Sequence, residues 1–315
     1  MPLHSQAQTV LDGVAAIGLP PFETLSLEEG RQALESLLQF MVPVEDVASV
    51  EDFAIPGPQG EIGLRLYRPE GDGLLPAVFY FHGGGFCAGS LDLVDPICRL
   101  ITNRSGCAVI SVDYRLAPEH PYPAGVTDAY VAISFVGACG DNFGIDPTRL
   151  AVVGESAGAT VATAACMLIR DKGLGDPEIK LQMLLCPIVD LVKFETPSYK
   201  EFGEGYLLTT AMMQAWKGHY LSGGDPARVV EPYCSPVREA NLNDLPPAII
   251  ITAEYDPLRD EGADYADKLA AAGVPVTYRM YEGATHGFWQ MSRLAPIGQR
   301  ALDECGDALR AAIGG

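Results

Sequence analysis

The chain has 315 residues, of which 48% are hydrophobic and 20% are charged, proportions that are ordinary for a globular protein. Its 41 acidic residues outnumber its 21 basic ones and give a formal net charge of −20 at pH 7. A polyanion repels nucleic-acid phosphates and anionic lipid surfaces, so we expect neither nucleic acid nor a membrane as a partner.

The cellular compartment and the state of the cysteines are predicted from the missing signal peptide, membrane span and paired-cysteine motifs. Residues 1–18 have no basic flank followed by an apolar run, which a signal peptide needs, and no apolar stretch approaches the roughly 20 residues of a membrane span. The eight cysteines form no CxxC pair and no metal-like spacing, and most lie in apolar stretches, where reduced core thiols are expected. We therefore expect a cytoplasmic protein without a metal site. A homodimer is compatible with the sequence.

In chain order, a mostly helical region comes first and a β/α alternation follows it. Ser26 and Glu29 have the spacing of a capping box, and residues 53–55 and 61–67 favour an antiparallel pair of strands. Short apolar runs then predict strands over 74–81, 107–112, 150–153, 181–185, 248–252 and 274–281. Helical patterns separate or follow them over 93–103, 127–136, 157–171, 263–272 and 299–312. This alternation predicts a doubly wound α/β fold with a mostly parallel sheet.

Two segments do not fit the alternation. Residues 190–225 carry aromatic and methionine side chains on a polar background, and the first 45 residues precede the sheet. Both could be ordinary surface helices. Alternatively, they fold over the carboxyl ends of the strands, where open α/β sheets bind ligands. We predict the second arrangement, with a cap built from 1–45 and 190–225 and a catalytic unit built from 46–189 and 226–315.

A Gly-Glu-Ser-Ala-Gly motif at 154–158 lies between a predicted strand and a predicted helix. A tight strand-to-helix turn would raise Ser156 above the edge of the sheet. Gly154 and Gly158 would let the backbone pass through a strained conformation without Cβ clashes. By itself the motif also fits a flexible glycine turn.

A second motif, His82-Gly83-Gly84-Gly85, follows the predicted strand over 74–81 directly. Three glycines allow bare backbone N–H groups to surround an oxygen on which negative charge develops. A phosphate-binding loop is the alternative, but neither GK[ST] nor GxGxxG follows. Two such motifs in this order, each after a strand, predict acyl transfer.

A serine hydroxyl needs a base to remove its proton, and the base needs an orienting carboxylate. His286 follows the predicted strand over 274–281, whereas the other four histidines lie at an end expected to fray, in the glycine loop, in a proline-rich loop and in the predicted cap (His4, His82, His120, His219). The carboxylate should lie between serine and histidine in chain order and after a strand. Asp256 meets both conditions, and Glu254 and Asp260 are close competitors.

With these residues in place, the chain resembles the hormone-sensitive-lipase-like family of esterases (the bacterial HGGG-type branch, family IV) over nearly its whole length. The most specific stretches are HGGGF (82–86), DYRLAPE (113–119), GESAG (154–158), YDPLRDE (255–261) and HGF (286–288). The resemblance implies the α/β-hydrolase fold with a helical cap. It also implies that the N–H groups of Gly84, Gly85 and Ala157 hold the oxyanion. Glu155 departs from the aspartate that is common in this branch, which leaves its hydrogen bonds open.

The predicted function is a serine carboxylesterase that acts on short- to medium-chain esters of small molecules. Ser156 would attack the ester carbonyl, His286 would accept its proton and Asp256 would orient the histidine, with no metal or organic cofactor. Five further residues should shape the two loops without reacting: His82, Gly83, Gly154, Glu155 and Gly158. The alternatives are an amidase or formamidase on the same fold, a non-catalytic small-ligand receptor such as the gibberellin receptors, and an interfacial lipase.

Overall fold

The computed structural model describes residues 3–71, 73–173 and 175–314. Among these residues, the centre is an eight-stranded sheet in the order β1-β2-β4-β3-β5-β6-β7-β8. Strand β2 pairs antiparallel with β1 and β4, and the remaining pairs are parallel. The predicted doubly wound α/β architecture is confirmed. The strands are β1 (Ser49–Gly57), β2 (Gly60–Arg68), β3 (Leu75–Phe81), β4 (Ala108–Asp113), β5 (Ile145–Glu155), β6 (Ile179–Leu185), β7 (Ala248–Tyr255) and β8 (Val276–Thr285).

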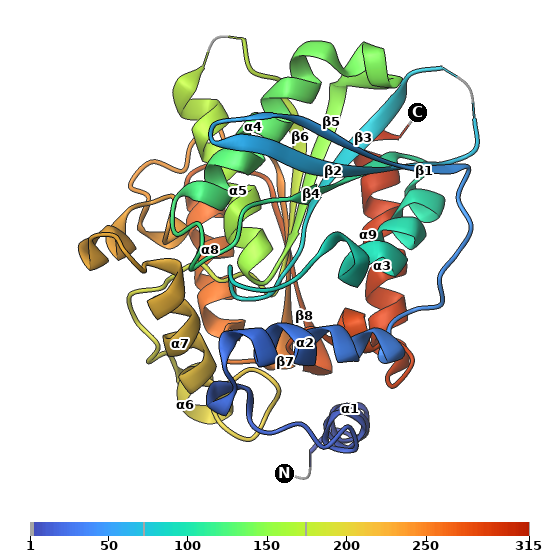
Figure 1. The fold of residues 1–315 in the computed structure, drawn as a ribbon. Helices are drawn as coiled ribbons and strands as arrows, with labels where there is room; N and C mark the ends of the chain where they lie inside the picture. Colours follow the sequence, from blue (N-terminus) through green and yellow to red (C-terminus); the bar gives the residue numbers. More distant parts are fainter. Residues whose placement is uncertain (1–2, 72, 174, 315) are drawn as a thin grey trace.

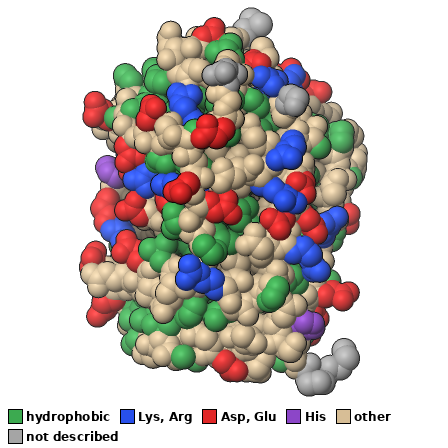
Figure 2. Space-filling model, turned by 90° about the vertical axis from the view of Figure 1, so that its right-hand side faces the viewer, with side chains coloured by type: hydrophobic (Ala, Val, Ile, Leu, Met, Phe, Trp, Pro, Cys, Tyr) green, Lys and Arg blue, Asp and Glu red, His purple; other side chains and the backbone are tan. Residues whose placement is uncertain are grey.

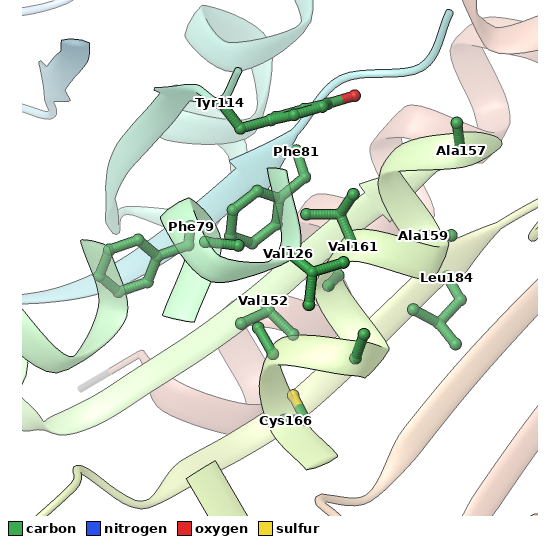
Figure 3. Packing of buried hydrophobic residues seen from close by; sticks show 14 of the residues in the cluster. Phe79, Phe81, Tyr114, Val126, Val152, Ala157, Ala159, Val161, Cys166 and Leu184 are labelled. Atoms are coloured by element: carbon green, nitrogen blue, oxygen red, sulfur yellow. The ribbon is translucent and has the colours of Figure 1, made fainter. Parts of the chain in front are cut away.

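Helices cover both faces of the sheet (Figure 1). On one face lie α4 (Ala124–Cys139), α5 (Ala157–Lys172) and α8 (Arg259–Ala271), and on the other lie α3 (Leu91–Ser105) and α9 (Pro296–Ile313). Figure 3 shows the first of these two cores, in which Phe81 and Val152 from the sheet gather with Val126 of α4 and Val161 of α5. Burial on both faces explains why the strands read as continuous apolar runs.

Three strands that lead to site residues extend further than the sequence predicts. Strand β5 starts at Ile145 and not at 150, β7 continues to Tyr255 and not only to 252, and β8 continues to Thr285 and not only to 281. The added parts contain polar or half-buried residues, which an apolar pattern does not mark. Pairing at their far ends holds these parts in the sheet, because Ile145 pairs with Leu75 and Thr285 pairs with Tyr255 across register irregularities.

The first helices and those of the insertion lie at the same end of the sheet, in the lower part of Figure 1. They are α1 (Ser5–Ala15), α2 (Leu27–Glu35), α6 (Pro197–Phe202) and α7 (Thr210–Tyr220), and α7 contacts the 3₁₀ turn Phe22–Thr24. The capping box forms at the start of α2 as predicted. The expectation that His4 lies in a frayed end is wrong, because its ring accepts the N–H of Gln6 and caps α1. The division into cap and catalytic unit stays a prediction.

On the face seen in Figure 2, acidic and basic side chains are intermixed with small hydrophobic areas. All eight cysteines are free thiols, and seven of them are buried. Within the described ranges, none of the helices combines the length and the apolar character that crossing a membrane requires.

Candidate active site

The turn between β5 and α5 carries the serine. Ser156 has φ 53° and ψ −118°, a conformation that side chains rarely adopt and that marks a strained strand-to-helix turn. The flanking glycines let the backbone pass this turn without Cβ clashes, as predicted. They are required by close packing, because a Cβ on Gly154 would lie 2.3 Å from the Gly158 carbonyl oxygen and one on Gly158 would lie 2.1 Å from the Phe81 carbonyl oxygen.

Ser156, His286 and Asp256 form one chain of hydrogen bonds. His286 Nε2 lies 3.0 Å from Ser156 Oγ, and His286 Nδ1 lies 2.8 Å from Asp256 Oδ2. Asp256 is fully buried and Ser156 is 6% exposed. A carboxylate can only accept, so Nδ1 carries the proton and Nε2 turns its lone pair toward the serine. This is the tautomer that a general base for the hydroxyl requires.

The other two acidic candidates have different partners. Glu254 accepts the Gly283 N–H at 2.7 Å, and Asp260 accepts the Ser198 N–H at 2.7 Å. Asp256 is held in place by the Leu258 N–H, which donates to its Oδ1 at 2.9 Å. Of the three carboxylates that follow or end β7, Asp256 is therefore the one bonded to His286.

The glycine loop after β3 contains backbone N–H groups that no protein group among the described residues accepts. Gly84 and Gly85 have φ of 118° and 61°, values that favour glycine. In the hydrogen bonds found over the described ranges, the backbone N–H groups of Gly84, Gly85 and Ala157 donate to no protein group. Gly83 differs, because its N–H donates to Glu155 at 3.1 Å. Three donors without a protein acceptor in the described part of the chain, one of them at the first residue of α5, suit an oxyanion.

His82, the first residue of the motif, holds the glycine loop through its ring and its carbonyl. It is fully buried, its Nδ1 donates to the Gly83 carbonyl at 2.7 Å, and its ring stacks on Tyr114 at 4.5 Å between centroids. The Tyr114 hydroxyl donates to the His82 carbonyl at 2.7 Å. Burial lowers the pKa of His82 to about 4, which keeps the ring neutral near pH 7.

An apolar cavity of about 80 Å³ lies above the serine. The residues that line this cavity include Ser156, His286, Gly83 and Gly84. Residues from both segments outside the β/α alternation complete the lining: Val14, Phe22, Leu34 and Leu37 from the first, and Leu207, Leu208, Met212 and Trp216 from the second. The two segments expected to form a cap thus line the same cavity as Ser156.

In the part of the chain that the structure describes, one group of potential metal ligands comes together. Donor atoms of Cys186, Asp256 and His286 lie within 4.8 Å of one another. Two of these residues are already hydrogen-bonded to each other, and burial raises the pKa of the Cys186 thiol well above its usual value. A protonated thiol is a poor ligand, so we interpret this group as the serine–histidine–aspartate arrangement and not as a metal centre.

Comparison with known proteins gives the family. A protein-family model described as the alpha/beta hydrolase fold matches residues 78–290. The chain belongs to the α/β-hydrolase family. It is 42% identical to the carboxylic ester hydrolase LipN of Mycobacterium tuberculosis, over 89% of this chain and 75% of the relative. It is 40% identical to the esterase LipI of the same organism, over 97% and 94% of the two chains.

Solved structures agree with this assignment. An α/β-hydrolase enzyme from the metagenome of Lake Arreo superposes on the chain with a TM-score of 0.93, at 39% identity and over 99% of both chains. The hyperthermophilic esterase of Pyrobaculum calidifontis gives a TM-score of 0.91 at 38% identity, again over 99% of both chains. The resemblance to hormone-sensitive-lipase-like esterases is confirmed by these relatives and by the family model.

The structure of this α/β-hydrolase also reveals contacts that sequence reasoning missed. Arg31 of α2 donates to the Cys87 carbonyl at 2.7 Å, to the Ala117 carbonyl at 3.2 Å and to both carboxylate oxygens of Glu119. It thereby joins the N-terminal segment to the glycine loop and to the DYRLAPE stretch. Trp216 of α7 lies against Gly85, since a Cβ on that glycine would come within 2.1 Å of its ring. The sequence held no signal for either contact, because the partners are far apart along the chain.

Proposed function

We propose that this α/β-hydrolase is a serine carboxylesterase for small-molecule esters with short to medium acyl chains. The observation that carries the proposal is the hydrogen-bonded chain from Asp256 through His286 to Ser156, which opens into an apolar cavity. The named relatives support ester hydrolysis, since they include an arylesterase of Saccharolobus solfataricus and an ethyl acetate hydrolase of Pseudomonas putida.

In the proposed reaction, Ser156 Oγ attacks the ester carbonyl while His286 Nε2 takes its proton. The tetrahedral oxyanion accepts hydrogen bonds from the N–H groups of Gly84, Gly85 and Ala157. His286 then protonates the departing alcohol and leaves an acyl-serine. A water molecule, deprotonated by the same histidine, repeats the sequence and releases the acid.

The acyl-length preference rests on the size of the cavity and on the cap. We infer that segments 1–45 and 190–225 act as the cap, because both supply apolar side chains to the 80 Å³ cavity. Each buried methylene of an acyl chain contributes about 0.8 kcal/mol until such a cavity is full. A cavity of this size favours short chains and disfavours a lipase that acts on long-chain triglycerides.

An acyl-length series of p-nitrophenyl esters tests the proposal, with matched amides beside each ester. Wild type should turn over the short esters, Ser156→Ala should lose that activity by several orders of magnitude, and Ser222→Ala, in the turn after α7, should keep it. A wild-type protein that hydrolyses none of these esters would contradict the esterase assignment. Faster turnover of the amides would favour the amidase alternative, and saturable binding without turnover would favour the receptor alternative.

Two further proposals concern compartment and assembly. A cytoplasmic location is supported by the eight free thiols. A homodimer is supported by the position of β8 at the end of the sheet, where Tyr278 is 41% exposed. Fractionation of cells and light scattering of the purified protein test the two proposals.

A further inference from the structure

Glu155 places a fully buried carboxylate next to the serine, at the last residue of β5. Three donors surround it. Oε1 accepts the Gly83 N–H at 3.1 Å and the Gln290 side-chain amide at 2.8 Å, and Oε2 accepts the indole N–H of Trp289. A buried carboxylate is expensive unless it is well paired, so this arrangement needs an explanation.

The three donors belong to the two loops that the reaction uses. Gly83 directly precedes Gly84, the first proposed oxyanion donor. Trp289 and Gln290 lie in the 3₁₀ turn Phe288–Met291, which begins two residues after His286. The carboxylate therefore connects the oxyanion loop, the serine turn and the histidine loop through one side chain. The oxyanion loop and the serine turn follow the paired strands β3 and β5, whose last pair is Phe81 and Gly154, whereas no pairing among the described strands ties the histidine loop to either of them.

We propose that Glu155 is a positioning residue, which fixes the oxyanion loop and the histidine loop relative to Ser156. The inference rests on the proposed esterase function. It assigns a role to the position at which this sequence has glutamate and the family branch commonly has aspartate. Glu155 itself does not exchange protons or form bonds with the substrate.

The length of the side chain matters to this role. An aspartate would withdraw the carboxylate by about 1.5 Å, the length of one carbon–carbon bond. Bonds that now span 2.8 to 3.1 Å would then exceed the limit of about 3.5 Å for a hydrogen bond. Glutamate reaches both loops from the backbone position that the serine turn dictates.

The charge matters as well. Burial raises the pKa of Glu155, while the hydrogen bonds from Gly83, Trp289 and Gln290 oppose this and favour the ionised form. An ionised carboxylate only accepts, which matches three N–H donors. Glutamine has the same shape, but its NH₂ group would face one of these donors. Glu155→Gln therefore tests polarity without a change in volume, and Glu155→Asp tests reach.

The experiment measures kcat, KM and thermal unfolding for wild type, Glu155→Gln and Glu155→Asp with p-nitrophenyl butyrate. Both variants should lower kcat by about 10- to 100-fold, the effect of displacing reacting groups by about 1 Å, with KM changed by less than about threefold. Glu261→Gln is the matched control, because Glu261 is also a buried glutamate and accepts backbone N–H groups of Val189 and Asp190. It should keep kcat even if the midpoint of unfolding falls.

A double-mutant cycle identifies the connection. Trp289→Phe keeps an aromatic ring and removes one donor, so it should lower kcat in wild type and add little in the Glu155→Gln background. Unchanged kcat in both Glu155 variants, an equal loss in Glu261→Gln, or additive effects in the cycle would overturn the proposal. These outcomes leave the esterase function standing; that function fails only if wild type is no more active than Ser156→Ala.

Discussion

The contact between Gly85 and Trp216 gives the sharpest test of how the insertion segment shapes the active site. A methyl group on Gly85 would lie 2.1 to 2.5 Å from three ring atoms of Trp216, a distance that forces either the ring or the loop to move. The residue also has φ 61°, and a left-handed conformation costs a non-glycine residue about 1–2 kcal/mol. Gly85→Ala thus introduces two separable penalties.

The two penalties differ in whether removal of the Trp216 ring can relieve them. The backbone penalty alone lowers the fraction of molecules with the loop in its active conformation by roughly tenfold, because about 1.4 kcal/mol is a factor of ten. A displacement of the N–H donors by about 1 Å raises the total loss in kcat/KM to around 100-fold. Removing the ring with Trp216→Ala should relieve the collision, so that Gly85→Ala/Trp216→Ala recovers to within about tenfold of Trp216→Ala alone.

The assay is kcat/KM for p-nitrophenyl acetate, whose short acyl chain depends least on the cavity wall that Trp216 provides. Gly84→Ala is the control, because its methyl group would lie 2.2 Å from the Ala88 carbonyl oxygen, inside the loop. Trp216→Ala cannot relieve a collision with backbone. The reasoning is refuted if the double variant at 85 and 216 shows no recovery, or if Trp216→Ala rescues Gly84→Ala equally well.

Two more predictions concern the hydrogen bonds of the site. The Asp256→Asn variant should fold normally but lower kcat by about four orders of magnitude. An amide whose oxygen still accepts the Leu258 N–H turns its NH₂ group toward His286 and imposes the wrong tautomer on the ring. Glu254→Gln should retain most activity, and the reverse ranking of the two variants would contradict the assignment. Burial lowers the pKa of His82 from 6.5 to about 4. As the pH falls, this histidine therefore binds a proton in the unfolded chain before it does so in the folded chain. Stability should be unaffected above pH 6.5 and fall by about 3 kcal/mol between pH 6.5 and 4. Urea unfolding of wild type and His82→Asn measures this, and an equal acid loss in both proteins would contradict it.

The sequence by itself determined the order of strands and helices and the position of the two groups that follow them and that we propose to react, Ser156 and His286. Apolar runs separated by helical patterns predict a sheet covered on both faces, because burial acts on each run locally. Ser156 and His286 could be identified because each stands in a distinctive motif directly after such a run. Strand lengths were underestimated, since β5 runs across an irregularity at 146–149 and pairs again at Ile145, opposite Leu75.

Only the tertiary structure decided which groups meet. Glu254, Asp256 and Asp260 lie within seven residues of one another, and the sequence spacing allowed any of them to reach the histidine. The structure turns the buried Asp256 toward His286 and the other two toward Gly283 and Ser198. The partners of Glu155 likewise lie 72 to 135 residues away. Such contacts depend on how distant strands are ordered in the sheet and on how their loops pack, which no local pattern of residues records.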